Sequence, residues 1–263
     1  SQAGLIRARL CGITHSDSPL IVFLDDDNLP DPDFLMNTSD FMEQHPHVGV
    51  AGGIVTGLFE TPPPDWLRLV QSALALRDFG TQPYFNKEKG VQPTDPIGAG
   101  MILRYGAIQG FPNWCHESSD IFGLGRRGAD LSGSEDSLIV LYVKALGYFS
   151  AYSPTLSLKH VIPANRLQFD YQLRLQRALG RSHAQLGLLT NDSIRRKGII
   201  KLIKDLIISA FRSIPKGRHV GWLQFNWKWS YYRAVITNRR HLKPLKFEQT
   251  ANTRELRSAD GVE

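Results

Sequence analysis

The chain of 263 residues is poor in cysteine and has no long uninterrupted run of apolar residues. Its two cysteines, Cys11 and Cys115, are far apart and in no ligand-like spacing, which argues against a disulfide framework and a zinc site and indicates a reducing compartment. No segment approaches the ~18 consecutive apolar residues of a membrane-spanning helix. The sequence also has no G-x-x-x-x-G-K-[ST] loop, which argues against a nucleoside triphosphatase of that kind.

Acidic residues are almost absent from one region of the chain. Residues 195–246 contain fourteen Lys or Arg and a single acid, Asp205, so this region carries a net charge of +13. The whole chain carries +6, which leaves −7 on the remainder. This asymmetry indicates two tasks, one for an acidic body and one for a basic C-terminal region.

Apolar runs alternate with segments of helical periodicity over residues 1–165. The pattern predicts strands at 20–24, from Val48, at 97–104 and over 148–162, and helices over 2–13, 31–44, 65–78 and 134–147. A mobile loop is expected at 81–96, and helices after Pro163. This alternation predicts an α/β sheet with ligands at the carboxyl ends of its strands. Because the chain begins on a helix that leads into a central strand, we expect further strands upstream of Ser1.

Three consecutive aspartates, Asp25–Asp27, follow Leu20–Leu24, which is predicted to be a buried parallel strand. Clustered carboxylates repel one another unless solvent or a cation offsets the repulsion. An EF-hand calcium loop does not fit, because Pro30 stands where that loop needs glycine. Asp25 and Asp27 can face one side of the chain, where Mg²⁺ or Mn²⁺ would be completed by substrate phosphates. A solvated acidic turn is the alternative.

Two further groups of polar residues follow. Glu135 and Asp136 open the helix predicted after Ser134. They are either capping acids favoured by the helix dipole or, for Asp136, a general base. His160 ends a strand and is followed by Arg166. The histidine is either structural or a metal ligand, with Arg166 then available to neutralise phosphate.

Three stretches in this order, FLDDDNLPDPDFL, GAGMILRYGAI and GSEDSLIVLYVKALGYFSAYSPTLSLKHVIP, resemble bacterial family 2 glycosyltransferases of the GT-A fold over residues 2 to about 166. The resemblance implies a nucleotide-diphospho-sugar transferase with a Rossmann-like mixed sheet, here incomplete at the N-terminus. It implies inverting transfer of a sugar from a nucleotide-sugar donor to a glycan or lipid-linked acceptor, with Mg²⁺ or Mn²⁺. We expect a catalytic domain over 1–165 and a helical basic extension over 166–263.

The resemblance also implies roles for individual residues on the donor side. Asp25 and Asp26 match residues near the ribose and diphosphate, and Asp27 matches the metal ligand of the D-x-D motif. Asp25 and His160 are expected as further metal ligands. Arg9 and Arg166 are expected at the donor, although Leu10 stands where the family usually has an asparagine.

On the acceptor side, Asp136 matches the catalytic base of the family's Glu-Asp motif. Glu135 lies beside it and is expected to share in catalysis at the acceptor. Gly98 and Gly100, in the second of the three stretches, are also expected on the acceptor side.

The basic C-terminal region combines an apolar stripe with cations and aromatic residues. The segment RRKGIIKLIKDLIISAFRSIPKG places Ile203, Leu206, Ile207, Ala210 and Ile214 on one stripe, with Lys197, Lys201, Lys204 and Arg212 mainly elsewhere. The segment GWLQFNWKWSYYR then clusters Trp222, Phe225, Trp227, Trp229, Tyr231 and Tyr232. This region predicts either an interfacial helix on an anionic membrane or a helix packed on the catalytic body. We expect a cytoplasmic protein, peripheral at the inner face of the cell membrane.

Two other functions are compatible with parts of the sequence. A metal-dependent phosphoryl or nucleotidyl transferase would also use the acidic clusters. A nucleic-acid-binding protein without catalysis would explain the basic and aromatic C-terminal region but not the acidic clusters. We therefore expect no nucleic-acid partner.

Overall fold

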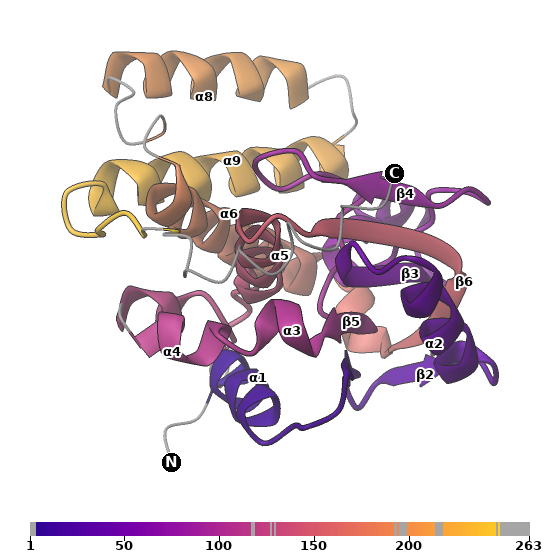
Figure 1. Cartoon of the computed structure of the whole chain (residues 1–263). Helices are drawn as coiled ribbons and strands as arrows, with labels where there is room; N and C mark the ends of the chain where they lie inside the picture. Colours follow the sequence, from indigo (N-terminus) through magenta and orange to yellow (C-terminus); the bar gives the residue numbers. More distant parts are fainter. Residues whose placement is uncertain are drawn as a thin grey trace.

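The computed structural model describes residues 4–116, 119–126, 128, 130–191, 194, 199–213, 218–245 and 247. Its strands are β1 (Leu20–Phe23), β2 (Asn28–Pro30), β3 (Val48–Phe59), β4 (Tyr84–Asn86), β5 (Met101–Arg104) and β6 (Phe149–Ile162). Its α-helices are α1 (Leu5–Thr14), α2 (Phe34–Gln44), α3 (Tyr105–Ile108), α4 (Phe111–His116), α5 (Glu135–Ala145), α6 (Phe169–Thr190), α8 (Ile199–Ser213) and α9 (Arg218–Asn238). Figure 1 shows these elements as a curved sheet beside stacked helices.

The strands form one mixed sheet in the order β1-β5-β3-β6-β2, and β4 also pairs with β6. Only β3 and β6 run parallel, and the other pairs are antiparallel. The predicted α/β class with a mixed sheet is therefore confirmed. The expectation of a buried parallel strand at Leu20–Leu24 was wrong in two respects, because β1 is half-buried and runs antiparallel to β5. With β5 as its one partner in the described sheet, β1 lies at an edge, where burial is incomplete.

The core lies on both faces of the sheet. Side chains alternate along β5, so Met101 and Leu103 pack with α1, α4 and α5 while Ile102 packs with α2 on the other face. The C-terminal helices continue this second core, since Leu175 of α6 and Leu223 of α9 belong to it. The helical region thus packs directly on the sheet, and the domain boundary at 165 stays a prediction.

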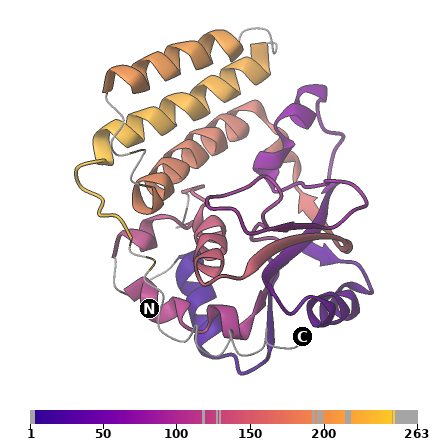
Figure 2. The ribbon, with the colours of Figure 1, turned by 45° about the horizontal axis from the view of Figure 1, so that its top comes forward.

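Helices α6, α9 and α8 form successive layers, with α8 outermost in both views (Figures 1 and 2). Gly180 of α6 allows the close approach of α9, because a Cβ there would lie 2.3 Å from the Trp227 carbonyl oxygen. Helix α8 is attached through Leu202, which is buried with Ala234 and Val235 of α9. The sheet and α6 remain separated from α8 by α9.

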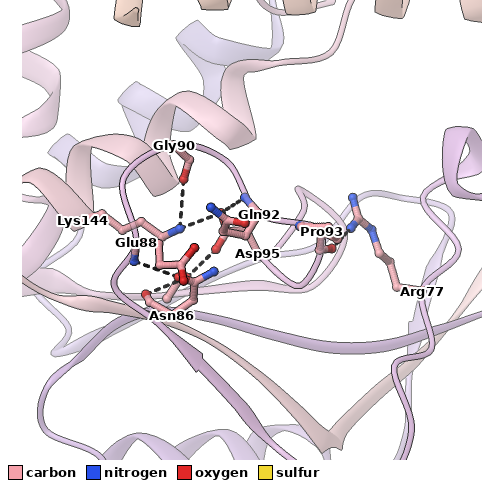
Figure 3. Close-up of polar contacts among 9 residues, drawn as sticks. Arg77, Asn86, Glu88, Gly90, Gln92, Pro93, Asp95 and Lys144 are labelled. Atoms are coloured by element: carbon pink, nitrogen blue, oxygen red, sulfur yellow. Dashed lines mark hydrogen bonds and ion pairs between the residues drawn. The ribbon is translucent and has the colours of Figure 1, made fainter.

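Two predicted segments differ from the structure. The helix expected over 65–78 is two short 3₁₀ helices, η1 (Asp65–Leu69) and η2 (Gln71–Leu74), and Ala75 then adopts a left-handed conformation that stops the helix. The segment 81–96, expected as a mobile loop, contains β4 and is attached to the body by a buried ion pair. In that pair Lys144 Nζ lies 2.8 Å from Asp95 Oδ2 (Figure 3).

Candidate active site

The residues predicted for the site come together, with one exception, around a cavity of about 870 Å³. The cavity lies where the Asp25–Asp27 turn, residues 97–99 and the start of α5 meet α6. Of the predicted residues it is lined by Arg9, Asp25, Asp26, Asp27, Gly98, Glu135, Asp136, His160 and Arg166. Asp27 and Arg166, which are 139 positions apart, thus share one site.

The three aspartates form the turn between β1 and β2, and Asn28 closes this turn. The Asn28 main-chain N–H donates to the Asp25 carbonyl oxygen at 3.0 Å, and its side-chain amide donates to Asp27 Oδ1 at 3.2 Å. Asn28 also lies opposite His160 in the β2–β6 pairing, which brings Asp27 close to that histidine. Burial raises the pKa of Asp25, while the positive charge of Arg9 acts in the opposite direction.

Asp27, His160 and Arg166 form a compact polar group. His160 Nδ1 lies 2.9 Å from the Leu74 carbonyl oxygen, which can only accept, so Nδ1 is the donor in this contact. Nε2 lies 3.2 Å from Asp27 Oδ2 and 3.3 Å from Arg166 Nη1. Arg166 Nη1 also lies 2.9 Å from Asp27 Oδ2. The Arg166 guanidinium therefore provides the positive charge that balances the Asp27 carboxylate.

The same group fits a divalent cation held by two protein ligands. Asp27 Oδ2 and His160 Nε2 are 3.2 Å apart, and the contact of His160 Nδ1 with the Leu74 carbonyl is the outer contact that metal-binding histidines usually have. Within the described ranges no three His, Cys, Asp or Glu side chains are close enough to hold a metal together. The prediction that Asp25, Asp27 and His160 ligate one metal therefore needs correction, because Asp25 is not close enough to the other two to bind the same ion. Substrate oxygens or water would have to complete the coordination.

Glu135, the first residue of α5, forms a buried ion pair. Its Oε1 lies 3.1 Å from Arg9 Nη1, and both side chains are at most 5% exposed. Its second oxygen, Oε2, is buried without a hydrogen-bond partner in the described structure. Burial, reinforced by the charge of Asp136, raises the pKa of Glu135 to about 7 against the opposing effect of Arg9. Glu135 is therefore a buried acid paired with Arg9 and not a solvated capping residue.

Asp136 points away from its neighbour and into the cavity. Its Oδ2 accepts a hydrogen bond from the Gly98 N–H at 3.1 Å, and its Oδ1 accepts one from the Ser137 N–H at 2.6 Å. Ser134 stands at the N-cap position, but its hydroxyl donates to Ser182 Oγ at 3.0 Å and makes no cap bond. The two main-chain donors fix the direction of the Asp136 carboxylate.

The two predicted glycines have different surroundings. A Cβ at Gly98 would lie 2.1 Å from Arg9 Nη2, so glycine is required there if Arg9 is to reach Glu135. Gly100 does not line the cavity. It adopts a φ of +72° beneath Leu158, where its N–H donates to the Phe23 carbonyl oxygen. The expected acceptor contact of Gly100 is thus replaced by a backbone role, since this conformation favours glycine.

Several cavity residues were missed by the sequence reasoning. Arg126 lowers the pKa of both Asp25 and Glu135, and the buried guanidinium of Arg77 interacts with Asp136. Helix α6 contributes Tyr171, Leu175, Leu179 and His183, and α9 contributes Trp227. The four α6 residues recur every fourth position, which marks one helix face. That spacing could have identified the face, but nothing in it indicates that the face borders the cavity.

Comparison with known proteins relates the first part of the chain to a family. Residues 1–110 match the family model described as Glycosyl transferase family 2, and none of the curated proteins matches the chain. The solved structures of GalNAc-T7 with UDP, GalNAc and Mn²⁺ and of S. aureus TarS 1–349 are similar at 14% and 11% identity, with TM-scores of 0.42 and 0.35. These alignments cover 92% and 91% of this chain but 45% and 72% of the other chains, so the chain spans less than half of GalNAc-T7. The matched residues 1–110 include the Asp25–Asp27 turn and Gly98, so this part of the chain is similar to Glycosyl transferase family 2.

Proposed function

We propose that the protein is a glycosyltransferase that transfers a sugar, with inversion, from a nucleotide-sugar donor to a hydroxyl group of a glycan or lipid-linked acceptor, with Asp136 as general base. The observation that carries the proposal is the separation of two acidic groups within one cavity. Asp27 lies with His160 and Arg166, whereas Asp136 is held by the N–H groups of Gly98 and Ser137. One group suits a diphosphate and the other suits an acceptor hydroxyl.

On the donor side, the leaving diphosphate needs positive charge. Arg166 lies at the cavity beside Asp27, and Arg126 lines the same cavity near Asp25. A divalent cation on Asp27 and His160, when bound, would stabilise the charge that develops on the leaving oxygen. Arg166 pairs with Asp27 Oδ2 in this structure. A divalent cation on that oxygen would replace this pairing, and Arg166 could then pair with the phosphates.

On the acceptor side, Asp136 would take the proton of the attacking hydroxyl. The hydroxyl oxygen bonds to the anomeric carbon while the bond from that carbon to the diphosphate oxygen breaks. The proton passes to Asp136, and the nucleoside diphosphate leaves with the bonding electron pair. Attack on the face opposite the leaving group inverts the configuration. A carboxylate with fixed direction is well suited to this transfer.

Replacing Asp136 by Asn tests the proposal, because the amide keeps the shape and loses the proton acceptor. Turnover should fall by about 10²-fold or more while donor affinity persists. Asp40→Asn, at an exposed site on α2 outside the cavity, is the matched control. Nuclear magnetic resonance of the product gives its anomeric configuration and separates sugar transfer from phosphoryl or nucleotidyl transfer. Near-normal turnover of Asp136→Asn would return this residue to a capping role.

We also infer that the protein works as a peripheral protein at the cytoplasmic face of an anionic membrane. The outward face of α8 supports this, because Ile200, Ile203, Ile207 and Ile208 are 47–74% exposed and Lys201 and Lys204 lie among them. On α9, Trp222 and Trp229 are about half exposed. Ile214 of the predicted stripe and Lys197 of the predicted cations lie outside the described residues, as do the side chains of Leu206, Ala210 and Arg212. In the described part of the chain no helix is both long and apolar enough to span a bilayer.

A further inference from the structure

A second cavity, of about 1040 Å³, adjoins the first. It lies between residues 87–91, the end of α5, the last two turns of α6 and the middle of α9. His183 and Trp227 line both cavities, and their rings meet edge to face at 5.7 Å. A chain-like ligand that extends from the first cavity past these two rings would enter the second.

The second cavity differs from the first in the charges that line it. Acids and arginines together line the first cavity, whereas the described lining of the second contains no acid. It contains Lys87, Lys89, Lys144 and Lys228. Lys144 is engaged by Asp95, but no carboxylate in the described structure lies within 4.0 Å of the other three amines. Three lysines are thus available to an anionic ligand.

Aromatic rings line the wall opposite residues 87–91. Trp227 and Tyr231 stack with ring centroids 5.4 Å apart and an interplanar angle of 9°, and Tyr232 stands edge-on to Tyr231. All three side chains are partly exposed. Lys228 lies 5.1 Å from the Trp227 ring centroid. Partly exposed aromatic faces next to cations suit sugar rings that carry negative charge, because the ring covers the C–H face of a sugar and the amine meets the anion.

The segment that carries Lys87 and Lys89 is held in place by a buried polar network (Figure 3). Lys144 Nζ bridges Asp95 Oδ2 and the Gly90 carbonyl oxygen, at 2.8 and 3.2 Å. Asp95 Oδ2 also accepts the Gln92 N–H at 2.7 Å, and Asp95 Oδ1 accepts the Ser150 hydroxyl. Both Asp95 and Lys144 are at most 5% exposed. The network fixes the lysine-bearing rim before any ligand arrives.

We propose that the second cavity binds an anionic stretch of the acceptor, a sugar chain that carries carboxylate or phosphate groups, and leads its terminal hydroxyl toward Asp136. The inference rests on the proposed function of the first cavity. It adds a substrate class, an acidic rather than a neutral acceptor. Because the lysines line the second cavity and Asp136 lines the first, the recognised anion would lie apart from the reacting hydroxyl.

Equilibrium binding without nucleotide-sugar tests the proposal independently of turnover. An oligogalacturonate, a neutral malto-oligosaccharide of equal length and glucose 1-phosphate are titrated into the full chain and followed by calorimetry. We expect the oligogalacturonate or the sugar phosphate to bind, and the double variant Lys87→Glu, Lys89→Glu to weaken that binding by about tenfold. The matched control is Lys201→Glu, Lys204→Glu, which makes the same charge change on the exposed face of α8 outside the cavity.

The anion that shows this dependence identifies the acidic group of the acceptor. Trp227→Leu should weaken the same ligand as well, since it removes the stacking surface at the junction. Equal binding to the Lys87/Lys89 variant and to the control, preference for the neutral oligosaccharide, or no binding of either anion would overturn the proposal. If Asp136→Asn retains turnover while anion binding follows the lysines, the proposed function fails and the anion site stands.

Discussion

At the scale of single residues, Glu135 and Asp136 are sequence neighbours whose carboxylates meet different surroundings. Glu135 is buried against Arg9 with one oxygen unpartnered, whereas Asp136 is turned into the cavity by two main-chain N–H groups. The chain thereby keeps a buried acid and an accessible one side by side. The buried acid positions Arg9, and the accessible acid is available for chemistry.

The buried position of Glu135 predicts a pH effect on stability. Because its pKa is raised from 4.5 to about 7, the folded protein holds this proton more tightly than the unfolded chain. The resulting stabilisation is complete below about pH 4.5 and is lost as the pH rises through about 7. Glu135→Gln cannot titrate and therefore does not lose this stabilisation. The free energy of unfolding of the variant, relative to that of the wild type, should rise over this pH range. A constant difference from the lost pairing with Arg9 is added at every pH.

Urea unfolding of both proteins at about pH 5 and about pH 8 measures this difference. Glu43→Gln, at an exposed position of α2, is the control and should show no such gain. If the free energy of unfolding changed with pH by the same amount in the wild type and in Glu135→Gln, the Glu135 carboxyl would titrate in the folded protein as it does in the unfolded chain.

Asp27 gives a prediction on the donor side. Asp27→Ala should abolish Mn²⁺- or Mg²⁺-dependent binding of a nucleotide-sugar, because it removes one of the two ligand atoms of the fitted site. The loss of stability should stay near 1 kcal/mol, since Asp27 and Arg166 are each about a quarter exposed. Calorimetric titration of UDP- and GDP-sugars with and without metal measures the effect, with Asp17→Ala outside the cavity as control. Undiminished metal-dependent binding would remove Asp27 from the metal site.

At the scale of elements, the segment 81–96 is attached to the sheet and α5 by one buried ion pair. Lys144→Met should destabilise the protein by about 3–5 kcal/mol, because it leaves Asp95 buried and unpaired. The matched control is Arg181→Met, which breaks an exposed pair with Asp130 at 3.5 Å and should cost about 1 kcal/mol or less. Urea unfolding measures both. Similar costs for the two variants would show that the buried pair does not hold this segment.

Short-range patterns predicted most elements, and long-range contacts decided the rest. The aspartate turn could be located because a run of apolar residues ends at Asp25, and the start of α5 because apolar residues at helical spacing follow Asp136. The antiparallel partner of β1, the 3₁₀ form of 65–74 and the bond from Ser134 to Ser182 depend on residues that come from elsewhere in the chain. The face of α6 that lines the cavity was missed for the same reason. The spacing of residues along a helix identifies a common face, but it does not show what that face contacts.

At the scale of the whole molecule, α8 is the outermost of the stacked helices (Figure 2), and its exposed side chains include isoleucines and lysines. Each lysine near anionic lipid contributes on the order of 1 kcal/mol, and the exposed isoleucines add apolar burial. We expect the protein to sediment with anionic vesicles, less so as salt rises, and not with neutral ones. Lys201→Glu, Lys204→Glu should release it, while Lys87→Glu, Lys89→Glu should not. Sedimentation that ignores salt and both charge reversals would contradict membrane attachment.

The polar pairs of the first cavity also bear on how the chain folds. Arg9 and Glu135 are 126 positions apart, and Asp27 and Arg166 are 139 apart. Closing loops of this length is entropically costly and slow compared with forming the helices that carry these residues. A chain with its helices formed but these loops open would therefore have its secondary structure and no active site. Recovered transferase activity, followed beside helical circular dichroism during refolding, would report when the distant segments meet.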